Sequence, residues 1–525
     1  MSVAGEARGL TLGAPALEAA RSSRRALGRV ALIAAICAVP VLLYLPFLTE
    51  PFFRDEGLYA AVAQMMLDGK IPYRDAFDNK PPMVFVWYAT SFVIFGEHVW
   101  APRLLVSLLL SGSVYLMYRE GRLLFSHRAG LIAALALAGS FGLATLETSA
   151  NTEYFMIPPL VAALYCFSMG KETGNPRWFA GAGFLSGIAM ATKHISLFVL
   201  VLYMALLAWP IVREHGVRGL WSARFRDSGG ALAAGCLGAG ALIIAPFAAT
   251  GTLPDLYEAT VVYTLEYVGA VPFTEKLGTL IDQPTFVLSV FGPFVLASAL
   301  GILYIARNGA NGHGPLVVGW LVANWLGIFA AGRFYDHYYA TLLPPIALLA
   351  PLGFLYVRER WPAPSWRYGV IAALAILMIV PLVQNAQIYF RATPESRHAA
   401  KYADDNRTSW ENDGAEFGAW LKARTRPGDG VYNFGFQSEL YFYSERQSPT
   451  RFIMDRPFWT NRDYIGEALD ELRADPPVYV IDSAIYEGWS QYELYTREVK
   501  AWILANYEFV GKVYYADVYV LKEHG

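Results

Sequence analysis

The sequence predicts a polytopic α-helical membrane protein with about eleven transmembrane helices, followed by a soluble α/β domain. Two observations support this fold class. The 525 residues are 55% hydrophobic and only 16% charged, whereas soluble domains carry about 25% charged residues. The apolar residues also gather in helix-length runs between residues 30 and 388, and a charged tail without such a run follows.

Charge and cysteine content exclude several classes of protein. Lys and Arg number 42 against 44 Asp and Glu, giving a net charge of −2. This balance excludes a strongly basic nucleic-acid binder and a disordered acidic chain, so no nucleic-acid partner is expected. Cys37, Cys166 and Cys236 all lie in apolar runs without disulfide or metal-ligand spacing, and we expect them to be small buried residues.

The first apolar run, residues 30–48, is long enough to cross a bilayer. Because it is longer than the core of a signal peptide and follows Arg21, Arg24, Arg25 and Arg29, we expect residues 1–29 to form a cytoplasmic tail. The other runs are residues 101–118, 130–147, 154–169, 179–193, 195–212, 230–250, 285–306, 315–331, 338–356 and 368–388.

Basic residues in the loops indicate the orientation of these spans. Lys and Arg concentrate in every second loop, whereas the intervening loops contain more carboxylates, Tyr, Pro and Asn. Since cytoplasmic loops carry the excess of Lys and Arg, the pattern predicts a multi-pass membrane protein with a cytoplasmic N-terminus. Its transmembrane domain would cover 30–388, with a long outer first loop at 49–100 and an extracytoplasmic α/β domain at 389–525.

The predicted C-terminal domain contains a candidate helix at 409–423 and strand-like segments at 430–436, 477–481 and 512–521. Its polar segment 435–452 is compatible with ordinary α/β packing, and no catalytic constellation stands out. The domain could cover a site and select an acceptor.

The first outer loop carries two groups of candidate functional residues. Asp55 and Glu56 follow the first span, and residues 57–67 have apolar side chains at helical spacing. This pattern predicts a helix on the membrane interface with both carboxylates at its N-terminus, although simple helix capping would produce the same pattern. Lys80 precedes two prolines and could either reach toward the interface or neutralise a lipid phosphate.

Three more outer tips combine polar and apolar residues: residues 147–153, Lys193 with His194, and residues 332–345. An aromatic interface belt with one ion pair would explain the last tip equally well. All these tips lie on the predicted outer side, whereas a proton-coupled transporter places its ionisable groups near the midplane. The arrangement favours a reaction between a lipid-borne substrate and an acceptor at the outer leaflet.

These motifs resemble the GT-C superfamily of membrane glycosyltransferases. More narrowly, the chain is similar to bacterial polyprenyl-phosphate-sugar transferases related to protein O-mannosyltransferases and the lipid A aminoarabinose transferase. The resemblance covers roughly residues 30–390. It rests on RDEGLYA at 54–60, NKPP at 79–82, NTE at 151–153, TK at 192–193 and HYYATLLPP at 337–345.

The resemblance implies an inverting glycosyltransferase of GT-C type that moves a hexose or pentose from a polyprenyl-phosphate sugar to a lipid, glycan or protein. It assigns Asp55 as the catalytic carboxylate, with support from Glu56, and it assigns Lys80 and Arg333 to the donor phosphate. Residues that would face the acceptor or the sugar are Tyr59, Asn151, Glu153, His337 and Tyr338.

The resemblance leaves metal binding open. Some members bind a metal through a carboxylate directly before the lysine and a later histidine, but this chain has Asn79 at the first position. Asp78 and His337 are the residues that could still hold a divalent ion. A lipid-linked donor requires no nucleotide-binding loop, and no Gly-rich fingerprint is present.

Two other functions are compatible with the fold class. One is a multispan transporter or flippase of a lipid-linked or small solute with an extracytoplasmic domain. The other is a non-catalytic membrane subunit that binds a partner and does not need Asp55.

Overall fold

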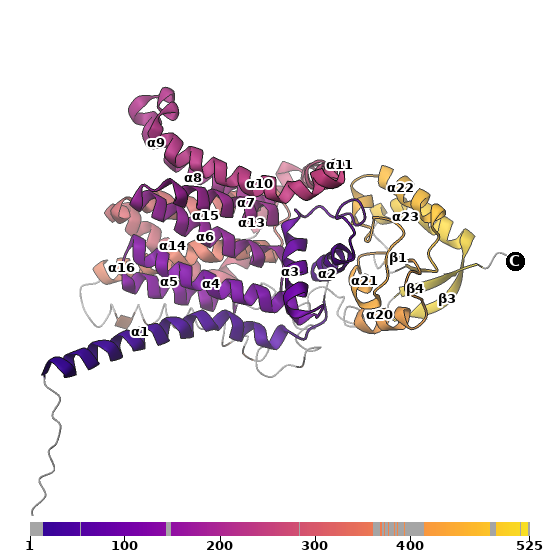
Figure 1. The fold of residues 1–525 in the computed structure, drawn as a ribbon, viewed down its shortest axis with the longest axis horizontal. Helices are drawn as coiled ribbons and strands as arrows, with labels where there is room; N and C mark the ends of the chain where they lie inside the picture. The colour runs from indigo at the N-terminus through magenta and orange to yellow at the C-terminus, as the bar shows by residue number, and fades with distance from the viewer. Residues whose placement is uncertain are drawn as a thin grey trace, which may run out of the picture.

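The computed structural model describes residues 14–52, 54–142, 149–282, 284–360, 414–482, 490–514 and 516–522, and a few single residues between 361 and 413. In these ranges the protein consists of a long helical bundle and a C-terminal region that contains a small sheet (Figure 1). The predicted eleventh span, 368–388, lies largely outside the described residues.

The helices of the bundle are roughly parallel to one another and bury a continuous apolar core (Figure 1). Its long helices are α1 (Ala14–Tyr44), α4 (Trp100–Leu124), α5 (His127–Ser140), α6 (Thr152–Thr173), α7 (Pro176–Thr192), α8 (Leu197–His215), α10 (Ala231–Thr250), α14 (Pro284–Asn308), α15 (Gly314–Ala331) and α16 (Leu343–Arg360). Shorter helices connect them: η1 (Leu45–Phe47), η3 (His194–Ser196), η4 (Val217–Trp221), α9 (Ala223–Phe225), η5 (Arg226–Gly230), α11 (Leu253–Tyr257), η6 (Glu258–Val262), α12 (Tyr263–Gly269), α13 (Phe273–Asp282), η7 (Gly309–Gly312) and η8 (Asp336–Leu342).

Each predicted span before residue 360 overlaps one or two of these helices, and residues 143–147 of the span 130–147 lie outside the described residues. The predicted polytopic helical fold is confirmed. Six helical segments in the described ranges are long and apolar enough to cross a membrane. They are Ala26–Phe47, Trp100–Leu124, His194–His215, Ala223–Thr250, Gly314–Ala331 and Asp336–Arg360. The three cysteines are free and only half-buried rather than buried as expected, because the outer surface of an apolar bundle need not be covered by protein.

The first outer loop folds into α2 (Arg54–Leu67) and α3 (Met83–Phe95) at one end of the bundle. The predicted helix at 57–67 is present, and it begins with Asp55 and Glu56 in its first turn. Unlike the expected interfacial helix, α2 is enclosed by protein, and its side chains from Leu58 to Ala63 are buried. The reason is that α3 and the C-terminal region pack against it.

The C-terminal region, residues 414–522, forms a four-stranded mixed sheet with short helices (Figure 1). The strands are β1 (Val431–Phe434), β2 (Tyr479–Asp482), β3 (Tyr507–Val513) and β4 (Ala516–Leu521), in the order β1-β2-β4-β3. Only β1 and β2 are parallel. The helices are α20 (Gly414–Lys422), α21 (Glu439–Ser444), η10 (Arg456–Trp459), α22 (Asp463–Ala474) and α23 (Ser490–Asn506).

The strand-like segment 512–521 is divided between two strands. The chain turns at Tyr514, which has a φ of 52°, and the segment belongs to the two antiparallel strands β3 and β4. The run of aromatic and β-branched residues hides this turn, because its sequence contains neither Gly nor Pro at the reversal.

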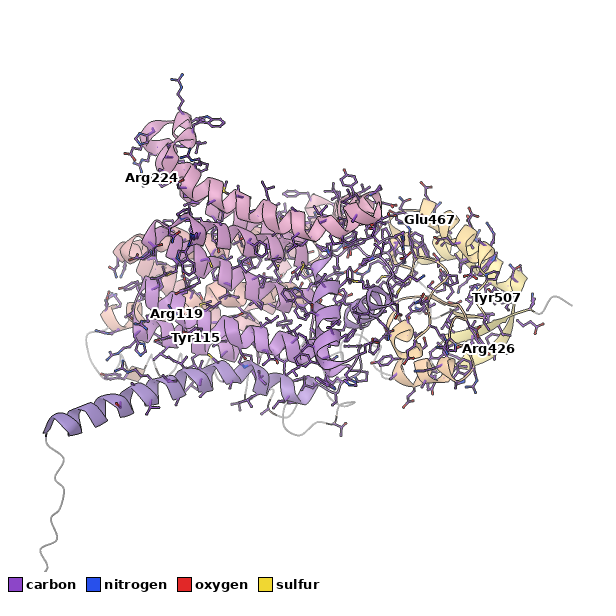
Figure 2. All side chains as sticks on the ribbon, viewed as in Figure 1. Tyr115, Arg119, Arg224, Arg426, Glu467 and Tyr507 are labelled. Carbon is purple, nitrogen blue, oxygen red and sulfur yellow. The ribbon has the colours of Figure 1, made fainter. Side chains whose placement is uncertain are left out.

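Hydrogen bonds and ion pairs attach the C-terminal region to the first outer loop. The backbone N–H of Phe77 donates to the Arg451 carbonyl oxygen over 2.7 Å. The Arg451 guanidinium forms ion pairs with Glu258 of η6 at 3.2 Å and with Glu467 of α22 at 2.6 Å. Glu467 is labelled on the side of the C-terminal region that faces the bundle (Figure 2). Arg451 therefore connects three segments that are far apart in the sequence.

The opposite end of the bundle is rich in basic side chains. Arg119 lies there, with its guanidinium over the rings of Tyr115 and Tyr165. Arg224 belongs to α9, which joins α8 to α10 and projects beyond the other helices (Figure 2). The two ends of the bundle thus differ in chemistry, with the C-terminal region at one and these arginines at the other.

Candidate functional site

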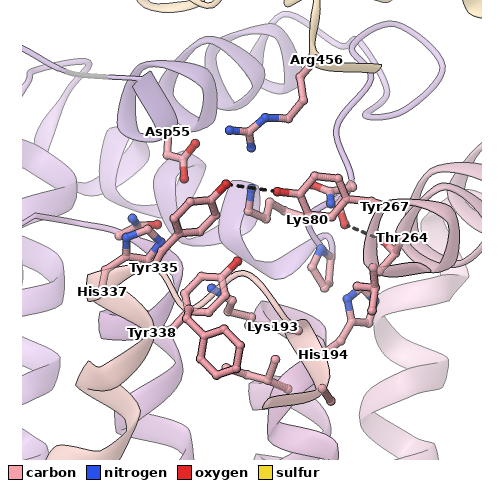
Figure 3. Close-up of a pocket in the computed structure, with 18 of the residues that line it drawn as sticks. Asp55, Lys80, Lys193, His194, Thr264, Tyr267, Tyr335, His337, Tyr338 and Arg456 are labelled. Atoms are coloured by element: carbon pink, nitrogen blue, oxygen red, sulfur yellow. Dashed lines mark hydrogen bonds between the residues drawn. The ribbon is translucent and has the colours of Figure 1, made fainter. Parts of the chain in front are cut away.

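A cavity of about 830 Å³ lies where the bundle meets the C-terminal region (Figure 3). Its walls come from residues within six separate parts of the chain before the C-terminal region, namely 55–56, 79–81, 149–151, 193–198, 264–268 and 330–338. The C-terminal residues Phe436, Arg456 and Trp459 complete the walls. The outer tips that the sequence analysis singled out therefore converge on one space.

Asp55 points into this cavity from the first turn of α2, where the helix dipole favours negative charge. Burial alone would raise the pKa of its carboxyl. The positive charges of Lys80 and Arg456 outweigh burial and hold the pKa of Asp55 well below its usual range. The carboxylate is therefore ionised and faces two cations across the cavity (Figure 3).

Lys80 is the cation of the first outer loop. The Tyr73 hydroxyl donates to the Lys80 carbonyl oxygen over 2.8 Å, and the Lys80 Nζ lies 5.8 Å from the centre of the Tyr59 ring. Burial alone would lower the pKa of Lys80. The carboxylates of Asp78 and Asp55 have the larger, opposite effect, so the pKa is raised above its usual value and the ammonium stays protonated. Within the described ranges, this ammonium has no hydrogen-bond or ion-pair partner.

Arg456 is the second cation, and the sequence analysis did not identify it. It begins η10 in the C-terminal region, and its guanidinium lies 5.0 Å from the centre of the Phe436 ring. No described residue hydrogen-bonds to this guanidinium or pairs with it. The local sequence contains no signal for this role, because only the folded chain brings residue 456 to the cavity.

Glu56 has a different environment from its neighbour Asp55. Arg103 of α4 donates from Nε to Oε1 over 3.0 Å and from Nη2 to Oε2 over 2.5 Å. The backbone N–H of Ala150 also donates to Oε1, over 2.7 Å. Glu56 is consequently bound on both oxygens, and it joins α2, α4 and the start of α6.

Arg333, which the resemblance assigns to the donor phosphate, lies beside Tyr267. Its Nη2 donates to the Tyr267 carbonyl oxygen over 3.1 Å, and its guanidinium carbon is 4.2 Å from the centre of the Tyr267 ring. The side chain is not among those that line the cavity. The Tyr267 hydroxyl lies 3.5 Å from that of Tyr335, and both tyrosines do line it (Figure 3).

Several other predicted residues form a connected group deeper in the bundle. Glu153 of α6 is fully buried and pairs with Lys193, and its Oε1 lies 3.9 Å from the His337 Nε2. The Lys193 Nζ lies 3.6 Å from the centre of the Tyr338 ring. Of these residues, Lys193, His337 and Tyr338 line the cavity, whereas Glu153 acts behind them.

The remaining predicted residues occupy two layers. Asn151 lines the cavity and caps α6, its Oδ1 accepting the Thr152 N–H over 2.8 Å. Tyr59 is fully buried behind it, and its hydroxyl donates to the same Oδ1 over 3.4 Å. Tyr59 therefore supports the cavity wall and does not itself face the cavity.

Asp78 is buried one residue before Asn79. Its Oδ1 accepts the Asn79 N–H over 2.7 Å, and its Oδ2 has no partner within the described ranges. Burial raises the pKa of Asp78, although Lys80 opposes this effect. No group of three or more His, Cys, Asp or Glu side chains in the described part of the chain is arranged to hold a metal ion. Asp78 and His337 thus have no third ligand there.

The architecture of the bundle and C-terminal region, with a carboxylate and cations at their junction, is the GT-C fold of membrane glycosyltransferases. It is shared with ArnT from Cupriavidus metallidurans, whose structure was determined bound to undecaprenyl phosphate. The TM-score is 0.59 and the sequence identity is 13%, and the match covers 95% of this chain and 98% of that one. The Archaeoglobus fulgidus oligosaccharyltransferase in complex with Zn and sulfate also matches, with a TM-score of 0.54, 14% identity, and 86% and 67% coverage.

Sequence comparison matches parts of the chain to glycosyltransferases. Residues 79–225 match the family model described as dolichyl-phosphate-mannose-protein mannosyltransferase. The putative mannosyltransferase YycA of Bacillus subtilis is 30% identical over 124 residues, which are 23% of this chain and 18% of YycA. The chain thus spans less than a fifth of the length of this curated relative. The segment that matches the family model, residues 79–225, lies wholly before the C-terminal region of this chain.

Proposed function

We propose that the protein transfers a sugar from a polyprenyl-phosphate-linked donor to an acceptor at the outer face of a bacterial cytoplasmic membrane. One observation carries this proposal: the ionised Asp55 and the unpartnered ammonium of Lys80 face the same cavity at one end of an apolar bundle. A lipid-anchored substrate can reach such a cavity from the membrane, while an acceptor approaches beside the C-terminal region.

The charges suit single displacement with inversion. As the anomeric C–O bond breaks, positive charge develops on the sugar and negative charge on the departing phosphate. Lys80 stabilises that phosphate, and Asp55 accepts the proton of the attacking acceptor hydroxyl. The new glycosidic bond forms on the opposite face of the sugar, and polyprenyl phosphate leaves. General base and electrostatic effects of this kind each contribute roughly 10²- to 10⁴-fold in rate.

The comparisons support a lipid-phosphate donor. ArnT was crystallised with undecaprenyl phosphate, and the matching family model describes a transferase that uses dolichyl-phosphate mannose. Mannose joined through phosphate to undecaprenol is therefore the first donor to test. A lipid, a glycan and a protein hydroxyl are the acceptor classes to offer with it.

The charges at the two ends of the bundle support an orientation in the membrane. Arg119 and Arg224 lie at the end away from the cavity (Figure 2), and Lys and Arg mark cytoplasmic ends. This arrangement supports a cytoplasmic N-terminus and an extracytoplasmic C-terminal region. The Asp55 cavity would then open at the outer leaflet.

The decisive experiment uses the full chain in nanodiscs with undecaprenyl-phosphate mannose labelled in the sugar. Wild-type protein should release undecaprenyl phosphate and form a mannosylated product. Asp55→Asn should lower this rate about 10²- to 10⁴-fold without loss of fold. Asp68→Asn, at an exposed residue just after the same helix, is the matched control and should keep the wild-type rate.

Other outcomes would identify the alternatives. A D55N variant with the full wild-type rate would remove Asp55 from the chemistry. Movement of the labelled lipid across vesicles with no glycosidic bond formed would indicate a flippase or transporter. Binding without product, across all three acceptor classes, would indicate a non-catalytic subunit.

A further inference from the structure

We propose that Arg456, carried by the C-terminal region, is the second cationic ligand of the donor phosphate and acts opposite Lys80. This inference rests on the proposed function and extends it. Both side chains line the cavity, although they are separated by more than 370 residues in the sequence. The site would then be shared between the bundle and the C-terminal region.

The first argument is the contrast between Arg456, which is half-buried, and the buried arginines. Arg103 binds Glu56 and three backbone carbonyl oxygens. Arg446 donates to Thr425 and neighbouring carbonyl oxygens, and Arg451 pairs with two glutamates. The guanidinium of Arg456 has no such partner among the described residues and lies beside the Phe436 ring. Its hydrogen-bond donors are therefore available to an anionic ligand in the cavity.

The second argument is the charge that remains at the cavity. Lys193 pairs with Glu153, and Glu56 pairs with Arg103. The other charged residues of the lining are Lys80, Arg456, Asp55 and Asp336, and His337 adds positive charge only if protonated. Lys80 and Arg456 are therefore the two cations of the described lining that can meet the single negative charge of a phosphodiester linking a sugar to a lipid.

The third argument is geometry. In Figure 3 the Arg456 guanidinium and the Lys80 side chain enter the cavity from different parts of the chain, and the hydroxyls of Tyr267 and Tyr335 lie near the end of Lys80. The Arg456 carbonyl oxygen also accepts the Tyr263 hydroxyl over 3.4 Å, which ties η10 to the bundle. A planar guanidinium can hold two phosphate oxygens at once, whereas the lysine ammonium acts as a point charge.

This assignment competes with Arg333. The Arg333 guanidinium is already stacked on the Tyr267 ring and bonded to the Tyr267 carbonyl oxygen, outside the cavity lining. Arg456, in contrast, lines the cavity together with Lys80. Recognition of the donor would consequently require the C-terminal region to be docked on the bundle.

The test measures lipid binding to the full-length protein in detergent by native mass spectrometry. The two probes are undecaprenyl phosphate and undecaprenol, which share the chain and differ in the phosphate. We expect Arg456→Ala to weaken binding of undecaprenyl phosphate by about tenfold to a hundredfold, the usual effect of losing a charge-assisted hydrogen bond. Binding of undecaprenol should change by less than about twofold, because it offers no phosphate to the guanidinium.

Three further variants complete the design. Arg456→Gln keeps much of the stem over Phe436 and carries the test if R456A does not fold. Arg333→Ala tests the competing assignment. Arg473→Ala is the matched control, because Arg473 is an exposed arginine of the same region that pairs with Asp470 at 2.9 Å. We expect R456Q to behave like R456A and R473A to behave like the wild type.

The outcomes separate this inference from the proposed function. Wild-type binding of undecaprenyl phosphate by R456A and R456Q would overturn only the role of Arg456. A larger loss in R333A than in R456A, or an equal loss of undecaprenol binding in R456A, would do the same. A wild-type protein that binds undecaprenyl phosphate no more tightly than undecaprenol would overturn the proposed function as well.

Discussion

Arg103 holds Glu56 by two parallel hydrogen bonds, from Nε to Oε1 over 3.0 Å and from Nη2 to Oε2 over 2.5 Å. Both carboxylates line the cavity, but the adjacent Asp55 faces its cations Lys80 and Arg456. Two neighbouring acids in one helical turn therefore have separate tasks. Glu56 fixes the turn against α4, and this leaves Asp55 available for chemistry.

The Glu56–Arg103 pair should be essential for stability. Arg103→Met leaves the Glu56 charge buried without its partner, and we expect it to lower the free energy of unfolding by about 3–5 kcal/mol. Arg74→Ala breaks an exposed ion pair with Asp75 and should cost at most about 1 kcal/mol. Thermal unfolding in detergent compares the two variants. Equal midpoints would show that the buried pair contributes no more than the exposed one.

The pH dependence of transfer should reflect the low pKa of Asp55. Burial raises that pKa, but Lys80 and Arg456 lower it by more, so the base is already deprotonated at about pH 5. A base supports the reaction above its pKa and loses activity as the pH falls through it. Wild-type kcat/KM should therefore show no loss from Asp55 between about pH 8 and about pH 5.

Removing one of those cations should raise the pH at which transfer activity is lost on acidification. In Arg456→Met the pKa of Asp55 rises, and activity is lost at a higher pH than in the wild type. A bound phosphate also raises the pKa of Asp55. As the pH falls, kcat should therefore be lost at a higher pH than kcat/KM. Initial rates over the pH range, with R473A as the control, test this. An unchanged acid limb in R456M would show that Asp55 does not sense this charge.

The buried pair of Glu153 and Lys193 should behave as a unit. Lys193→Met leaves Glu153 charged and fully buried, and we expect a loss of about 3–5 kcal/mol in stability. The double variant Glu153→Leu with Lys193→Met replaces the pair by apolar groups and should recover most of that loss. Thermal unfolding of the single and double variants measures the coupling. Additive losses would show that the two charges do not depend on each other.

Arg451 should control the position of the loop that carries Lys80. Its guanidinium pairs with Glu258 and Glu467, and its carbonyl oxygen accepts the Phe77 N–H. Arg451→Ala should speed hydrogen–deuterium exchange over residues 71–80 and weaken binding of undecaprenyl phosphate by roughly tenfold. R473A should leave both unchanged. If exchange in this segment stays at the wild-type rate, the ion pairs do not anchor the loop.

Sequence patterns predicted the helical bundle and the wall of the cavity that carries Asp55 and Lys80. Long apolar runs leave few alternatives to membrane helices, since backbone polar groups must be satisfied within the segment. The motifs around Asp55 and Lys80 lie on the loop that forms one wall of the cavity. Polar residues between apolar helices were likewise informative, because they are costly there without a function.

The rest of the site depends on tertiary contacts that no local pattern encodes. Residues 436–459 look like ordinary polar and aromatic residues of an α/β domain, yet they supply Arg456, Phe436 and Trp459 to the cavity. Burial of α2 is equally invisible, because its amphipathic sequence suits either a lipid interface or a protein cover. The different partners of Glu56 and Asp55 arise only when α4 packs beside α2.

The distance along the chain between the cavity walls has a consequence for biosynthesis. Asp55 and Lys80 leave the ribosome long before Phe436, Arg456 and Trp459. Chains fold largely in the order in which they are made. A nascent protein can therefore insert most of its helices while its cavity still lacks one wall. Synthesis of the C-terminal region then acts as a checkpoint, because only a chain that includes this region can close the cavity around a substrate.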